Sequence, residues 1–174
     1  MTTDTGEGLV ALLRDAPLVD GHNDLLWALR ELAEGREDDE GDPDLREPVP
    51  ELQTDLPRLA TGGVGAQFWS VYVPSHLPPA DAVTRTLEQI DAFYALLRRY
   101  PDRLEQARTA DDVERIARSG KIASTIGVEG GHQIGGSLGA LRVLSRLGAG
   151  YLTLTHNDDT DWADSATGRH RTAA

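Results

Sequence analysis

Residues 121–156, "KIASTIGVEGGHQIGGSLGALRVLSRLGAGYLTLTH", contain two apolar runs separated by a helical pattern. The first run, Lys121–Val128, ends at a glycine-rich cluster and predicts a buried strand. Ser137 can cap a helix that runs to Leu147, where a glycine follows. The second run, Tyr151–His156, predicts another strand. The order of strand, helix and strand predicts a right-handed β-α-β unit with two parallel strands.

The same alternation extends toward the N-terminus of the chain. "PLVDGH", Pro17–His22, and "VGAQFWSVYV", Val64–Val73, predict two more strands. Apolar residues recur at steps of three and four over Asp81–Tyr100, which predicts an amphipathic helix. A shorter helix follows, with Thr109 and Asp112 at the spacing of a capping box. Four strands alternating with helices predict an α/β fold whose parallel strands are buried on both faces.

Two segments fall outside this alternation. Residues 1–16 are expected to form an N-terminal tail or a helix. The segment Leu32–Glu51 is rich in charged residues, Gly and Pro, and it predicts a solvated loop.

Composition limits the functions that the chain can have. Its 174 residues fit one domain, and its net charge of −12 disfavours binding to nucleic acid or to an anionic membrane surface. The chain has no cysteine, so any metal would be held by His, Asp and Glu. The N-terminus lacks the basic start of a secretory signal, and no stretch approaches the ~20 apolar residues of a membrane span. We therefore expect a cytoplasmic protein.

Polar residues follow three of the four predicted strands. His22 and Asp24 come after the first strand, Glu129 after the third and His156 at the end of the fourth. Ligand sites of parallel α/β folds lie at the carboxyl ends of the strands, so these side chains are expected at one rim. His22 and Asp24 stand two residues apart and can share one cation. An imidazole together with carboxylates suits zinc.

Each of these residues also has an ordinary structural interpretation. A His-x-Asp pair is common in turns and caps, and the glycines around Glu129 can simply form a tight turn. His156 can be a hydrogen-bonded core histidine, and His132 either a ligand or a loop residue. The coincidence of three strand ends favours a site.

Several longer motifs resemble one known family. "LVDGHNDLLWALR", "TDLPRLATGGVGAQFWSVYVP", "GVEGGHQIGGSLGALRVLSRLGAGYLTLTHND" and "WADSATG" resemble the N-terminal half of the renal-type membrane dipeptidases. These are zinc metallodipeptidases of the amidohydrolase-like barrel group. The resemblance runs from Pro17 to Gly168 and implies the first four β/α units of a (β/α)₈ TIM-like barrel, apparently truncated. The tail 169–174 does not match.

The resemblance also implies roles for the candidate residues. His22 and Asp24 would bind one zinc ion, and Glu129 would bridge it to a second. Glu129 and His156 would be catalytic, with His156 contacting a dipeptide substrate that is hydrolysed by metal-activated water. His-x-Asp in place of His-x-His is typical of the dipeptidase branch and disfavours a deaminase or amidase.

Half a barrel would expose the edges of its sheet. Unpaired strand edges recruit other strands, so association with another chain, including a homo-oligomer, is expected. An alternative function is therefore that of a catalytically inactive remnant that acts by association. The two remaining functions are a dipeptidase and a non-catalytic binding chain.

Overall fold

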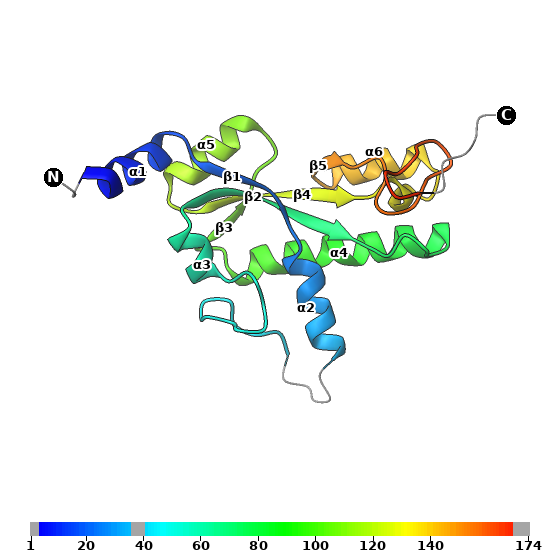
Figure 1. The fold of residues 1–174 in the computed structure, drawn as a ribbon, viewed down its shortest axis with the longest axis horizontal. Coiled ribbons are helices and arrows are strands. Elements are labelled where there is room, and N and C mark those ends of the chain that lie inside the picture. The colour runs from blue at the N-terminus through cyan, green and yellow to red at the C-terminus, as the bar shows by residue number, and fades with distance from the viewer. Residues whose placement is uncertain (1–3, 36–40, 169–174) are drawn as a thin grey trace.

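The computed structural model describes residues 4–35 and 41–168; residues 36–40 and the predicted tail 169–174 lie outside the described residues. The helices are α1 (Asp4–Asp15), α2 (Leu25–Glu34), α3 (Leu56–Thr61), α4 (Pro79–Arg99), α5 (Ala110–Arg118), the 3₁₀ helix η1 (Gly131–Ile134) and α6 (Leu138–Arg146). The strands are β1 (Leu18–Asn23), β2 (Val64–Tyr72), β3 (Leu104–Gln106), β4 (Ile122–Glu129) and β5 (Ala149–Leu152). They form one parallel sheet, as expected of an α/β fold (Figure 1).

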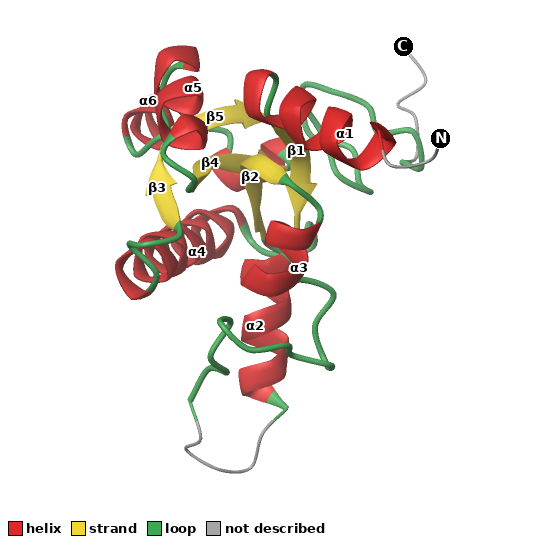
Figure 2. Cartoon of the chain, turned by 90° about the vertical axis from the view of Figure 1, so that its left-hand side faces the viewer, coloured by secondary structure: helices red, strands yellow, loops and turns green. Residues whose placement is uncertain are grey.

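Strands β2 and β4 form the centre of the sheet. β2 lies between β1 and β4, and their register pairs Ser70 with Gly127 and Tyr72 with Glu129. The other edge of β4 is shared, because β3 pairs with its first residues and β5 with its last ones (Figure 2). The described strands thus form an open sheet, in which β1 pairs with β2 alone.

One face of the central strands is packed against α4, which runs along that side of the sheet (Figure 1). The buried residues that form this core include Trp69, Val71, Ile126 and Val128 from the strands and Ile90, Phe93 and Leu96 from α4. The apolar stripe predicted over Asp81–Tyr100 is therefore confirmed as the buried side of a helix. No helix within the described ranges is both long and apolar enough to cross a bilayer.

Further predictions of local structure are confirmed. The predicted strands Pro17–His22, Val64–Val73 and Lys121–Val128 correspond to β1, β2 and β4, and residues 4–15 of the N-terminal segment form a helix. At the start of α5, Thr109 Oγ1 accepts a hydrogen bond from the Asp112 amide while the Asp112 carboxylate accepts one from the Thr109 amide. This reciprocal pair is the predicted capping box.

The strand predicted at Tyr151–His156 is wrong in its bounds. β5 ends at Leu152, four residues before His156. The Thr153 amide donates to the Val128 carbonyl at 3.0 Å, one residue before β4 ends at Glu129. Beyond it Gly130 adopts φ +119° and the chain turns into η1, so β5 has no partner with which to continue. The predicted count of four strands is also wrong, because the three-residue strand β3 lacks a readable pattern.

The solvated loop predicted at Leu32–Glu51 is wrong in part. Leu32–Glu34 belong to α2, and the apolar residues Leu45 and Val49 are buried in the core. The Leu45 amide donates to the hydroxyl of Tyr100 at 2.8 Å, which fastens this segment to the end of α4.

The expectation that every strand is buried on both faces is also wrong. β1 is an edge strand, and Leu18 and Val19 are 44% and 51% exposed. Burial on both faces needs helices and strands on every side. Within the described residues, helices and strands surround β2 and β4 in this way but leave one side of β1 open.

A buried carboxylate joins the loop before α3 to that helix. Asp55 is fully buried and accepts from the Arg58 amide at 2.8 Å, the Val49 amide at 3.1 Å and Arg58 Nε at 2.9 Å. The two terminal nitrogens of Arg58 donate to the carbonyls of Leu52 and Val49. Asp55 is thus both the N-cap of α3 and the anchor of the loop.

Replacing Asp55 with Ala is expected to lower the free energy of unfolding by about 3 kcal/mol, because it breaks a buried ion pair and removes a cap. Urea denaturation followed by circular dichroism measures the change. The control is Asp91→Ala on the exposed side of α4, where the ion pair with Arg98 is long at 3.8 Å. Its effect is expected to stay within about 0.5 kcal/mol. Equal effects of the two substitutions would contradict the assigned role of Asp55.

Candidate metal centre

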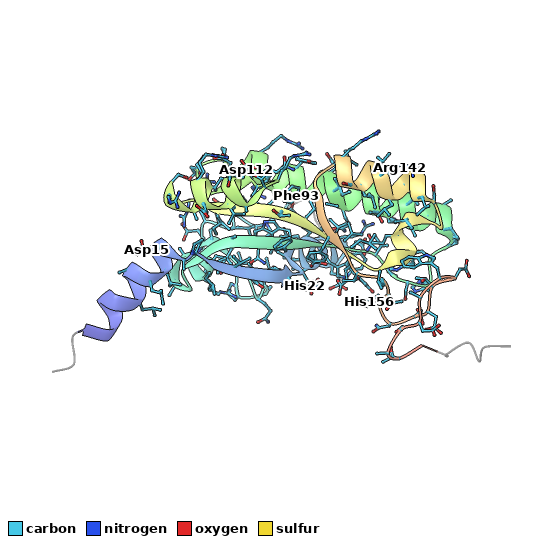
Figure 3. All side chains as sticks on the ribbon, turned by 90° about the horizontal axis from the view of Figure 1, so that it is seen from above. Asp15, His22, Phe93, Asp112, Arg142 and His156 are labelled. Atoms are coloured by element: carbon cyan, nitrogen blue, oxygen red, sulfur yellow. The ribbon has the colours of Figure 1, made fainter. Side chains whose placement is uncertain are left out.

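Four candidate residues lie at the carboxyl end of the sheet. His22 is near the end of β1, Asp24 is the N-cap of α2, and Glu129 is the last residue of β4. In Figure 3 His22 and His156 are labelled close together near the middle of the view, and Asp15 lies toward the N-terminal end. Asn23 Oδ1 accepts from the Leu25 amide at 3.0 Å, so the turn from β1 into α2 is closed next to the candidate ligands.

Three of these side chains converge. His22 Nε2 lies 3.2 Å from Asp24 Oδ1 and 3.5 Å from Glu129 Oε2. One ligand atom from each of the three residues lies within 4.8 Å of the other two. An imidazole nitrogen and two carboxylate oxygens at this separation can contact one cation.

The electrostatic surroundings of the group fit a divalent cation. Among the residues that the structure describes, the ion-pair partners of Asp24 and Glu129 are His22 and His156, and neither carboxylate has a Lys or Arg beside it. Two carboxylates this close repel each other unless a proton or a cation lies between them. A bound cation would remove that repulsion.

Two buried side chains hold Glu129, and sequence reasoning missed both. Ser70 Oγ donates to Glu129 Oε2 at 2.9 Å, and Gln133 Nε2 donates to the Glu129 carbonyl at 2.8 Å and to the Val71 carbonyl at 2.9 Å. Both residues are fully buried. A polar Ser inside the apolar run "FWSVYV" was the available signal, since a buried hydroxyl needs a partner.

Gly130 explains part of the glycine cluster around Glu129. Its φ of +119° is a conformation that other residues rarely adopt, and an added Cβ would lie 2.4 Å from the His132 ring. His132 itself lies in η1, where its Nε2 is 2.9 Å from the Val73 carbonyl, and burial lowers the pKa of its imidazole. His132 is therefore engaged with the backbone and lies outside the converging group.

The sequence placed His156 at the end of a strand, and this is wrong. His156 approaches the group from the loop after β5. Its Nε2 lies 3.5 Å from Glu129 Oε1, and its ring packs against Tyr72 with the centroids 5.0 Å apart. Ser165 Oγ donates to the His156 carbonyl at 2.9 Å, which ties this loop together. His156 Nδ1 is buried and makes no hydrogen bond with any described residue.

A cavity of about 320 Å³ opens beside these residues. Its lining consists of Asp24, Trp27, Ala28, Glu31, Tyr72, Glu129 and His156. Trp27 stands edge-on to Tyr72, with ring centroids 5.0 Å apart. Burial is the main cause of a raised pKa for the Tyr72 phenol, and the nearby charge of Glu129 adds to it.

Tyr151 is a further neighbour of the group that sequence reasoning missed. Its hydroxyl donates to the Gly21 carbonyl at 3.0 Å and lies 3.3 Å from His22 Nδ1. The ring lies over Gly127, where an added Cβ would come within 2.3 Å of it. Burial raises the pKa of the Tyr151 phenol.

Comparison with known proteins identifies the family. Residues 7–174 match the model of the membrane dipeptidase family, peptidase family M19. "Dipeptidase 3" of Mus musculus is 47% identical over 161 residues, which are 92% of this chain and 31% of that protein. "Dipeptidase verJ" of Clonostachys rogersoniana is 44% identical over 164 residues, which are 88% of this chain and 41% of that protein. The chain thus spans less than half the length of these relatives.

A solved structure supports the same assignment. A metallopeptidase from Rhodobacter sphaeroides, crystallised with a phosphinate mimic of the dipeptide L-Ala-D-Ala, superposes with a TM-score of 0.61 at 26% identity. The match covers 78% of this chain and 44% of that one. The family match over nearly the whole chain, these relatives and the converging candidate ligands agree: the chain belongs to the membrane dipeptidase family, peptidase family M19.

Proposed function

We propose that the chain carries part of the active site of a zinc-dependent dipeptidase, and that its parallel sheet is part of a (β/α)₈ barrel. The observation that carries this proposal is the convergence of His22, Asp24 and Glu129 at the carboxyl end of the sheet, in a chain of a dipeptidase family. The carboxyl end is where barrel enzymes hold their catalytic groups.

The ligand roles follow from the directions in which the donor atoms face. His22 Nε2 and Asp24 Oδ1 would hold one zinc ion together with Glu129 Oε2. Glu129 Oε1 faces the other way, toward His156, so the carboxylate can bridge to a second ion. Zinc bound there would polarise the scissile carbonyl and activate a water for attack at neutral pH.

His156 is suited to contact the substrate. Its buried Nδ1 has no hydrogen-bond partner among the described residues, and an unpaired N–H costs more than an unpaired lone pair. The proton of the neutral ring therefore belongs on Nε2, which faces the cavity. From there Nε2–H can donate to the carbonyl oxygen of a dipeptide and to the negative charge that develops on it.

The cavity suits a small dipeptide. Its volume of about 320 Å³ is at the lower end of small-molecule sites. Tyr72 and Trp27 offer apolar walls, and the Glu31 carboxylate offers a partner for a cationic group such as the ammonium of the substrate. The metallopeptidase from Rhodobacter sphaeroides that this chain resembles was crystallised with a phosphinate mimic of the dipeptide L-Ala-D-Ala.

Association through the open edge of the sheet is a second candidate function. Within the described ranges, β1 pairs on one side only, and Leu18 and Val19 expose apolar side chains beside that edge. The occupant that we propose is β1 of a second copy of this chain. Two-fold symmetry would make the new pairing antiparallel.

The Glu129→Gln substitution tests the metal centre. The substitution removes one of the two negative ligand charges. It is expected to weaken zinc binding by at least about 100-fold, since losing a residue that only hydrogen-bonds to a ligand already costs about 10–100-fold. Isothermal titration with zinc measures the affinity, and turnover on a panel of dipeptides is expected to fall in parallel. The control Glu114→Gln changes an exposed glutamate on α5 that pairs with Arg118. Equal zinc affinity of the Glu129→Gln and wild-type chains would refute the centre.

Ser70→Ala tests whether the hydroxyl orients the Glu129 carboxylate. Zinc affinity is expected to fall about tenfold while both ligand charges remain. Ser124→Ala is the matched control, since Ser124 is equally buried on the neighbouring strand but bonds to the Ile122 carbonyl. If both variants bound zinc as tightly as the wild type, Ser70 would have no role in the centre.

Val19→Lys tests the edge-to-edge association, because a lysine at a strand edge opposes pairing. Sedimentation velocity is expected to show a dimer for the wild type and a monomer for Val19→Lys. The control Val143→Lys alters an exposed valine on α6 and should leave the dimer intact. A wild-type chain that stays monomeric at every concentration would rule the association out.

A further inference from the structure

The hydroxyl of Tyr151 lies between two polar groups near the end of β1, a backbone carbonyl and an imidazole nitrogen. It is 3.0 Å from the Gly21 carbonyl oxygen and 3.3 Å from His22 Nδ1. The carbonyl oxygen can only accept a hydrogen bond, whereas the imidazole nitrogen can donate or accept. The identity of the donor in the second contact therefore follows from the first.

The hydroxyl has a single proton. Since that proton is donated to the Gly21 carbonyl, the Tyr151 oxygen can interact with His22 only as an acceptor. The contact with Tyr151 forms when His22 Nδ1 carries the proton of the neutral imidazole. This leaves a lone pair on Nε2, the nitrogen that faces Asp24 and Glu129.

We propose that Tyr151 is a positioning residue, which holds His22 in the Nδ1–H tautomer and so keeps Nε2 free to bind a cation. The inference rests on the proposed metal centre. A second partner on the far nitrogen is a general means of orienting a histidine ligand.

The carboxylates of the site act against this tautomer. Asp24 Oδ1 lies 3.2 Å from His22 Nε2 and can only accept a hydrogen bond from it, and Glu129 Oε2 at 3.5 Å also attracts a proton to that nitrogen. A proton on Nε2 would have to leave before a cation could bind there. Without the Tyr151 hydroxyl, His22 should therefore shift to the Nε2–H tautomer and bind zinc more weakly.

The Tyr151 ring is held by packing, independently of its hydroxyl. It lies over Gly127, which has no side chain to displace it, and its centroid is 5.2 Å from that of Phe68. Tyr151→Phe should therefore keep the ring in place and remove only the hydrogen bonds. The substitution isolates the effect of the hydroxyl.

The test compares Tyr151→Phe with the wild type by two measurements. Zinc affinity, measured by competition with a chromophoric chelator, is expected to fall about tenfold. Long-range ¹H–¹⁵N spectra of the zinc-free chain, with His22 assigned from a His22→Gln variant, report which ring nitrogen is protonated. The wild type is expected to be protonated at Nδ1 and Tyr151→Phe at Nε2.

Tyr94→Phe is the matched control, because its hydroxyl donates to the Leu147 carbonyl at 2.6 Å. It should change neither measurement. An unchanged zinc affinity or an unchanged tautomer in Tyr151→Phe overturns the role of Tyr151 and leaves the metal centre standing. A wild-type chain that binds no zinc overturns the centre and this inference together. Should Tyr151→Phe fail to fold, an Nε2–H tautomer in the wild type would still overturn the inference.

Discussion

The parallel pairing of β2 with β4 supports both the core and the candidate metal centre. In its register Ser70 lies opposite Gly127 and Tyr72 opposite Glu129. Trp69, Val71, Ile126 and Val128 bury one face of the pair against α4, and this burial holds the backbone of the other face in place. The packed face therefore holds Glu129 in place near the Asp24 carboxylate, and the core supplies the stabilising energy that offsets the repulsion between the two.

The candidate centre depends on groups that supply none of the proposed ligand atoms. Ser70 and Gln133 fix the side chain and the carbonyl of Glu129, while the hydroxyl of Tyr151 reaches His22 from the far side. Each of these contacts crosses from one strand or helix to another. Metal sites generally need a few ligand atoms on rigid elements, with hydrogen-bond partners that orient each ligand.

Much of this arrangement could be predicted from residue patterns. The strands β1, β2 and β4, the helix α4 and the capping box of α5 follow from hydrophobic period and capping chemistry, which act over a few residues. The candidate ligands followed from their positions after predicted strands. The pattern failed where long-range contacts decide: β3 exists because β4 offers it an edge, and β5 stops at Leu152 because β4 turns away at Gly130.

Local sequence was thus sufficient for the α/β class, the main elements and the identity of His22, Asp24 and Glu129 as a candidate group, since these depend on neighbouring residues and on chemical type. The distances within the group, the approach of His156 from a loop, and the partners Ser70 and Tyr151 were settled only by the three-dimensional fold. Residues 22 and 151 meet because separate strands pair with the same sheet, and no local pattern encodes that register.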